Sequence, residues 1–337
     1  ANFIGARKVT YIISGVLVVI GILGVNPHIM GKLNLGIDFS GGRNYIVRFA
    51  EPVNTQEVNA ALDNVFMEAK TQAGDEETFA LNVITIGDAN QVRISTNYRI
   101  NDNSETLDDE IEALLYAGCQ QFLPEGVTLD EFKSTEINPT VGIMQSQKVG
   151  PAIADDITQS AVWAVLAALV GIFLYVLARF RNFAFSVGAL TGLAHNTIIV
   201  LGAYALLWKV MPFSMEIDQA FIAAILTVIG YSINDTVVIF DRVREYTGLY
   251  PKRDRKQNIN DALNHTLSRT FSTSMSTLVV LIAIFCFGGE TIRGFVFALL
   301  IGVIVGTYSS LCVATPLAYD IQEALERRKA KKAELKK

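Results

Sequence analysis

The segment from Ala220 to Phe240 is apolar and long enough to cross a lipid bilayer, yet it contains Asn234 and Asp235. A carboxylate at the centre of a membrane-spanning helix costs about 2.5 to 3.5 kcal/mol on insertion scales. Such side chains usually pair with one another or face a water-filled cavity, and they mark ion or proton pathways. We therefore predict a working role in proton movement for Asp235, with Asn234 beside it. The alternative is a buried hydrogen bond between helices that moves no ion.

Five further apolar runs accompany this segment. Of the 337 residues, 51% are hydrophobic, and the mean hydropathy is +0.35. Runs of about 17 or more apolar residues indicate transmembrane helices. Since no small-residue cleavage site follows the first run, we interpret it as a retained helix. The sequence predicts a polytopic α-helical membrane protein whose six transmembrane helices span 9–25, 157–178, 183–207, 218–240, 270–287 and 294–318.

Basic residues are concentrated at the two termini and in alternate connections between these helices. They lie at 7–8, 179–181, 242–256 and 327–337. The positive-inside rule therefore places both termini in the cytoplasm and the block between the first two helices outside. We expect four parts: 1–27 with the first helix, an external domain over 28–150, a helical bundle over 151–320, and a basic tail over 321–337.

The polar block reads as an α+β domain. Strands are predicted at 44–49, 79–86, 91–96 and 128–136, with helices at 55–70 and 104–122, the second capped by Ser104. This βαββαβ order is ferredoxin-like. We find no nucleophile paired with a base, no cysteine spacing typical of zinc or of disulfides, and no phosphate loop. The pattern favours a binding or force-transmitting domain over an enzyme, with no cofactor or metal, and the acid-rich block disfavours nucleic acid.

Further polar residues lie within the other apolar runs. Histidine at membrane depth can carry protons, because its unperturbed pKa is near neutrality, but it can also be a packing residue. Arg269 is the natural counter-charge of Asp235 if it turns inward, whereas outward it would reach the headgroups. Hydroxyls beside it could hold water or a proton wire. The residues of this predicted proton path are His195, Asn196, Tyr231, Thr273 and Ser276.

Several stretches together resemble the SecF family, whose members work with SecD in bacterial protein export. They are Gly-Ile-Asp-Phe-Ser-Gly-Gly at 36–42, Val-Gly-Pro at 149–151, and Tyr-x-x-x-Arg-Phe at 175–180. Ile-Gly-Tyr-Ser-Ile-Asn-Asp-Thr-Val-Val-Ile-Phe-Asp-Arg-Val-Arg-Glu at 229–245 and Asn-x-Thr-x-Ser-Arg-Thr at 264–270 complete the set. The family is related to the resistance-nodulation-division (RND) transporters, which use intramembrane carboxylates to move protons.

The resemblance implies a protein of the cell inner membrane that uses the proton-motive force to assist preprotein translocation. It implies SecD, the SecYEG translocon and unfolded preprotein at the periplasmic face as partners, with YajC and YidC as further candidates. Asp235 and Arg269 match the family's intramembrane pair. The external motif of the family contains Gly36, Asp38, Gly41 and Gly42.

The sequence departs from the family at Asn196, where the family often has aspartate after the histidine. The resemblance implies either the SecF subunit or the SecF half of a fused SecDF. Because the chain begins with Ala1 and not with Met, we expect it to be cut from a longer chain, such as a fused SecDF. Two alternatives remain open from the residues: an RND-type half-transporter for small molecules or lipids, and a passive scaffold of the translocon.

Overall fold

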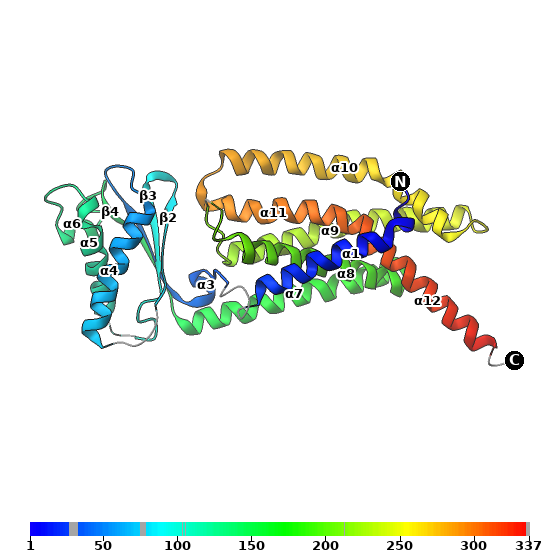
Figure 1. Ribbon diagram of the computed structural model, residues 1–337, viewed down its shortest axis with the longest axis horizontal. Helices are drawn as coiled ribbons and strands as arrows, with labels where there is room; N and C mark the ends of the chain where they lie inside the picture. Colours follow the sequence, from blue (N-terminus) through cyan, green and yellow to red (C-terminus); the bar gives the residue numbers. More distant parts are fainter. Residues whose placement is uncertain (27–32, 75–78, 103, 105, 212, 335–337) are drawn as a thin grey trace.

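The computed structural model describes residues 1–26, 33–74, 79–102, 104, 106–211 and 213–334. A long helical bundle occupies most of the molecule, and a small domain built on a β-sheet lies at one end of it (Figure 1). Both chain termini lie toward the opposite end, where helix α12 projects from the bundle. We call the two ends of the bundle the sheet end and the tail end.

Six helical spans in the described part are long and apolar enough to cross a membrane, as the sequence predicts. The sixth combines α11, a π-helical turn at Ser310–Ala314 and α12. The apolar parts of α8, of α9 and of the sixth span are about half buried, against only 6% for α7, so these three spans form the centre of the bundle. The bounds are α1 Phe3–Val25, α7 Pro151–Phe180, α8 Phe183–Leu207, α9 Gln219–Leu249, α10 Arg255–Phe287, α11 Glu290–Ser309 and α12 Thr315–Glu334.

Residues 246–268, which join the predicted spans 218–240 and 270–287, are mostly helical. Helix α9 continues to Leu249, and α10 already begins at Arg255, so the connection is short. The early turns of α10 place Ile259, Ala262 and Leu263 in a buried cluster with Val243 of α9. This packing favours continuous helix because it buries an apolar face that a loop would leave exposed.

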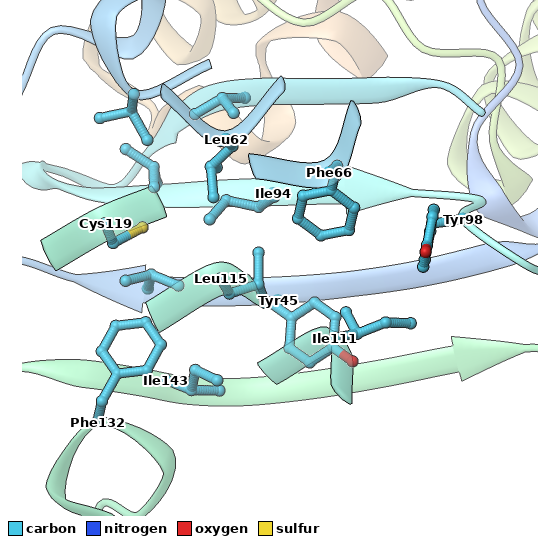
Figure 2. Close-up of a cluster of buried hydrophobic side chains, with 14 of the residues drawn as sticks. Tyr45, Leu62, Phe66, Ile94, Tyr98, Ile111, Leu115, Cys119, Phe132 and Ile143 are labelled. Atoms are coloured by element: carbon cyan, nitrogen blue, oxygen red, sulfur yellow. The ribbon is translucent and has the colours of Figure 1, made fainter. Parts of the chain in front are cut away.

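The sheet has four antiparallel strands in the order β2-β3-β1-β4. Helices α4 and α5 cover one face, and Figure 2 shows Leu62 and Phe66 of α4 and Leu115 of α5 directed at the strands. Burying each such side chain contributes roughly 1.5 to 3 kcal/mol. The bounds are β1 Gly42–Arg48, α4 Thr55–Ala73, β2 Leu81–Ile86, β3 Asp88–Thr96, α5 Leu107–Cys119, a 3-10 turn at Gln120–Phe122, α6 Leu129–Lys133 and β4 Gly142–Val149.

The predicted last strand at 128–136 is wrong. That segment contains α6, because Thr128 and Glu131 form a capping box that starts a helix. The fourth strand is β4, which leads into α7 through Gly150, with Pro151 in the first turn of α7. Ser104 is not the cap of α5 either, since that position belongs to Thr106.

Candidate functional site

Asp235 lies in α9, about 24 Å along the helix from Gln219 at a rise of 1.5 Å per residue. The residue is only 5% exposed, and its Oδ2 atom has no hydrogen-bond partner among the described residues. The carboxylate faces α10, where the Ser274 hydroxyl is close enough to interact with it. That hydroxyl also bonds Thr307 Oγ1 of α11 at 2.6 Å. Asp235 therefore lies where three helices meet.

Helix α11 approaches α9 closely beside this site because it presents glycine. A Cβ atom on Gly302 would lie 2.1 Å from Val228 Cγ2, and one on Gly306 would lie 3.1 Å from Ser232 Cβ. Small residues at such spacing allow helix backbones to pack tightly in a membrane. The close approach puts the polar groups of α11 within reach of α9.

Arg269 does not form an ion pair with Asp235 in this conformation. Arg269 is exposed on α10. In the described ranges, no carboxylate oxygen lies within 4.0 Å of its side-chain nitrogens. It is nevertheless near enough to act on Asp235 electrostatically. The structure thus has the two charges as neighbours without direct contact.

A second set of polar side chains surrounds the turns of α9 next to Asp235. Asn196 Nδ2 of α8 donates to Ser232 Oγ at 2.8 Å, and Thr236 Oγ1 lies 2.8 Å from Ser310 Oγ. Ser310 opens the π-helical turn, and π turns are frequent at functional sites. Helices α8 and α9 and the π-helical turn that follows α11 are therefore joined by side-chain hydrogen bonds around the depth of Asp235.

His195 is buried but points to another part of the bundle. Its Nδ1 atom lies 3.3 Å from Asn196 Oδ1, and its Nε2 atom has no partner in the described structure. Its ring lies 6.1 Å from that of Tyr308, whose hydroxyl bonds Ser14 of α1. Within the described residues, hydrogen bonds through Asn196 and Ser232 link His195 to the Asp235 region.

The remaining predicted path residues are not gathered at the carboxylate. Tyr231 has a buried hydroxyl without a partner in the described part, whereas Asn234 is exposed on the outer face of α9. Thr273 and Ser276 are exposed, and their hydroxyls bond carbonyls of their own helix. The hydroxyls that do line the site are Ser274, Thr307, Ser232, Thr236 and Ser310.

The glycine motif lies at the sheet end and holds the start of the Asp235 helix. The short helix α3, Ile37–Ser40, follows Gly36, whose N–H donates to the Ile217 carbonyl at 2.9 Å. Asp38 Oδ2 accepts the N–H of Gln219, the first residue of α9, at 3.2 Å. A helix N-terminus favours such a carboxylate because its N–H groups carry partial positive charge.

Gly41 and Gly42 then turn the chain into β1. Gly41 has φ +69° and Gly42 φ +144°, and a Cβ on Gly42 would lie 2.7 Å from the Thr96 carbonyl oxygen. Positive φ and this close approach both require glycine. The motif therefore connects α9 directly to the sheet.

A charged contact adds a second link between the sheet and the bundle. Arg93 of β3 pairs with Glu216 at 2.8 Å, and Asn82 of β2 donates to the same carboxylate at 3.0 Å. Asp218, two residues further, caps α9 by accepting the N–H of Phe221 at 2.8 Å. Burial raises the pKa of the Asp218 carboxyl, and the nearby Asp38 adds to this rise, while the Phe221 bond and Arg93 oppose it.

No group of three or more His, Cys, Asp or Glu side chains that could hold a metal occurs in the described ranges. The described part of the bundle contains the buried carboxylate of Asp235, the neighbouring guanidinium of Arg269, and hydroxyl and amide groups joined by hydrogen bonds.

Comparison with known proteins agrees with the motifs. The family model described as "Protein export membrane protein SecD/SecF, C-terminal" matches residues 130–324, and the "SecD/SecF GG Motif" matches residues 31–53. Protein translocase subunit SecF of Rhodothermus marinus is 37% identical over 97% of this chain and 95% of its own length. SecF of Haemophilus influenzae is 34% identical over 95% of this chain and 86% of its own.

Two solved structures share the fold. SecDF of Thermus thermophilus, described as a translocon-associated membrane protein, superposes with a TM-score of 0.73 at 28% identity. A super-membrane-facing form of SecDF gives 0.61 at 29%. These matches cover 96% and 98% of this chain but only 39% and 40% of the SecDF chains, so the chain spans about two fifths of SecDF. The length and identity of the matches show that the chain belongs to the SecF family of protein translocase subunits.

Proposed function

We propose that this subunit couples proton movement through its membrane bundle to preprotein translocation, together with SecD. As a member of the SecF family it is an accessory subunit of the Sec translocon. The observation that carries the proton coupling is the buried Asp235 carboxylate with one oxygen unpartnered in the described structure. The names of its relatives favour neither a small-molecule exporter nor a passive scaffold.

Protonation of Asp235 is the proposed switch. When it is ionised, Asp235 attracts Arg269, and a pair at about 4 Å contributes roughly 4 kcal/mol at an effective dielectric of about 20. When it is protonated, that attraction is absent, as in the unpaired arrangement described above. A membrane potential supplies about 2.3 kcal/mol per charge per 100 mV. The two energies are comparable, so one proton can change how α9 and α10 pack.

Asn196, Ser232, Thr236 and His195 would then serve as a hydrogen-bonded route on the other side of α9. The unpartnered His195 Nε2, within the described residues, supports this idea because a buried polar atom of this kind commonly binds water. Tyr231 offers a second such atom. We propose that Thr273 and Ser276 join this route in another conformation, in which α10 rotates toward Asp235.

Motion of α9 would reach the external domain through its first turn. The Asp38 bond to Gln219 and the Arg93–Glu216 pair support a stiff connection between α9 and the sheet. Gly36, Gly41 and Gly42 are the proposed backbone elements of this connection. The protonation state of Asp235 would thereby change the position of the sheet domain.

We further propose that the sheet end is periplasmic and that both termini are cytoplasmic. Basic residues gather at the tail end, in keeping with the positive-inside rule. The element order and the β2-β3-β1-β4 strand order support a ferredoxin-like external domain over 28–150. The other proposed parts are 1–27, the bundle 151–320 and the basic tail 321–337.

SecD is the proposed partner at the outer face of α9. Asn234, Gly230 and Thr227 lie exposed along this face, and small and polar residues are the ones that pack and bond between membrane helices. SecYEG and unfolded preprotein at the periplasmic face complete the proposed assembly. YajC and YidC are further proposed neighbours.

Proteoliposomes containing the chain with SecD and SecYEG provide the test. Proton flux and preprotein translocation are measured for the wild type and for Asp235→Asn. We expect the variant to assemble normally but to lose proton-dependent translocation. The matched control is Asp156→Asn, which makes the same change at an exposed position in the first turns of α7 and leaves both activities intact. Wild-type flux in Asp235→Asn would contradict the proposal.

A further inference from the structure

A basic cavity lies at the tail end, away from the carboxylate site. It has a volume of about 500 Å³ and lies between the α7–α8 corner, the end of α9, the start of α10 and α12. Its polar wall contains Arg181, Arg244, Arg255 and Lys329 against the single acid Glu326. The cavity therefore carries an excess of positive charge.

Two of these cations already have protein partners. Arg255 pairs with Glu326 at 2.7 Å, and Arg244 pairs with Asp241 at 2.9 Å. Arg181 and Lys329, by contrast, form no ion pair with any acid in the described part of the chain, and both are exposed. The two cations that remain available for a ligand thus come from opposite walls, α7–α8 and α12.

The backbone holds Arg181 at the corner in an unusual way. Arg181 ends α7 with φ 50° and ψ 34°, in the left-handed region that usually takes glycine or asparagine at this position. The next residue, Asn182, uses its side chain to cap α8 through the N–H of Ala184. This corner thus has a guanidinium at a position where glycine or asparagine would fit the backbone better.

The cavity has an apolar wall that continues onto the exposed surface of the bundle. Phe180, Phe183 and Phe185 line it, and the Arg244 guanidinium lies 5.4 Å from the centre of the Phe180 ring. Phe183, the first residue of α8, is 55% exposed and packs edge-on against Phe173 at 6.1 Å. A basic pocket thus opens directly onto an apolar face.

We propose that this cavity binds an anionic glycerophospholipid, with its phosphate between Arg181 and Lys329 and an acyl chain along Phe183 and Phe173. Basic pockets between membrane helices attract anionic headgroups, and arginine suits phosphate because its planar fork donates two parallel hydrogen bonds. The exposed Phe183 beside the cations favours a lipid over free phosphate, which has no apolar part. The site is independent of proton coupling at Asp235.

The test measures lipid binding to the purified full chain in a neutral detergent by native mass spectrometry. Phosphatidylglycerol, phosphatidylcholine and inorganic phosphate are titrated separately, with phosphate also added in competition. The variant Arg181→Asn/Lys329→Gln removes both free cations, and asparagine tolerates the left-handed backbone. Lys331→Gln/Lys332→Gln removes the same charge from exposed positions of α12 outside the cavity.

Each cation near a membrane surface is worth about a fivefold change in affinity for anionic lipid. We expect phosphatidylglycerol affinity to fall about 25-fold in the cavity variant and less than twofold in the tail variant. Equal losses in both variants, equal binding of phosphatidylcholine, or displacement of the lipid by equimolar phosphate would each overturn the proposal. Thermal unfolding without lipid must match the wild type in both variants, since misfolding would also lower binding. If it does not, Arg181→Lys, which keeps the charge but loses the planar fork, must bind phosphatidylglycerol more weakly than the wild type and more tightly than the cavity variant.

Discussion

The Asn196 amide donates a hydrogen bond to the Ser232 hydroxyl over 2.8 Å, joining α8 to α9 three residues before Asp235. Both residues are buried: Asn196 is 0% exposed and Ser232 is 2% exposed. An amide can donate this bond without carrying a charge. The bond fixes how α9, and with it the buried carboxylate, sits against the centre of the bundle.

Replacing Asn196 should cost stability. In Asn196→Ala the Ser232 hydroxyl loses its partner, and membrane helix bonds of this type are worth about 1 kcal/mol. We expect the free energy of unfolding to fall by about 1 to 2 kcal/mol, including the small cavity, in denaturation of the detergent-solubilised chain. Thr191→Val on the exposed face of the same helix should change it by less than about 0.5 kcal/mol. Equal stability of both variants would contradict the role of the bond.

Arg269 should be dispensable for folding but required for coupling. Arg269 forms no ion pair with any residue that the structure describes, so Arg269→Gln should alter the free energy of unfolding by less than about 0.5 kcal/mol. If ionised Asp235 attracts it during the cycle, proton flux in proteoliposomes should fall at least tenfold. Arg269→Lys, which keeps the charge, should recover part of the flux. A stability loss above about 2 kcal/mol in Arg269→Gln would instead indicate a pair in the resting state.

The positions of the six apolar spans could be predicted from the sequence, because crossing a bilayer requires a long run of apolar residues and a few polar residues do not obscure such a run. The secondary structure of the domain that contains the sheet was harder to predict. The capping box at Thr128 and Glu131 is a local helix signal, and the β-branched residues around it obscured it. The true last strand, β4, ends in the polar run Gln145–Lys148, which resembles a loop in sequence, and it is a strand because it pairs with β1.

The site was predictable in its central residue and less so in its surroundings. A charge inside an apolar run identifies Asp235 without any knowledge of packing. The neighbouring face of α10 is a different matter, because hydroxyls occur on every side of its first membrane turns. Thr266, Thr270 and Ser274 repeat every four residues and are all buried, whereas Thr273 and Ser276 are exposed. Only the contact between Ser274 and Thr307 of α11 identifies the buried face.

Helix α11 should not tolerate a side chain at Gly302. In Gly302→Ala the new methyl group would overlap the buried Val228, so α9 and α11 must separate. We expect a loss of about 1 to 3 kcal/mol in the free energy of unfolding, the usual cost of overpacking. Gly230→Ala on α9 meets nothing within 4 Å and should be neutral or stabilising by up to about 1 kcal/mol. Similar stability of the two variants would mean that the helices are not in tight contact there.

The Arg93–Glu216 pair should hold the sheet domain onto the bundle. Glu216 is 8% exposed as a side chain and Arg93 18%, so removing one partner leaves a poorly solvated charge. Arg93→Gln should destabilise the chain by about 2 to 4 kcal/mol, whereas the double change to Arg93→Gln/Glu216→Gln should recover part of that loss. Hydrogen exchange of β2 and β3 amides reports the domain contact. Additive effects of the two changes would show that the pair carries no coupling energy.

Asp218 should make the stability of the sheet end depend on pH. Burial raises the pKa of its carboxyl in the folded chain, so folding favours the protonated form. The stability that this group contributes is complete below the ordinary value of 3.8 and is lost as the pH rises through the folded value. Asparagine keeps the cap on the Phe221 N–H but has no charge to bury.

Asp218→Asn should therefore raise the thermal midpoint relative to the wild type at pH 7. The difference should shrink as the pH is lowered toward the ordinary value of 3.8, because a growing fraction of the folded wild-type carboxyl is then protonated. Thermal unfolding of both proteins between pH 4 and pH 8 measures it, and Asp156→Asn, exposed on α7, controls for the general loss of one negative charge. A midpoint lower than that of the wild type at pH 7 would mean that the negative charge of Asp218 stabilises the start of α9 through the helix dipole and Arg93 more than its burial costs.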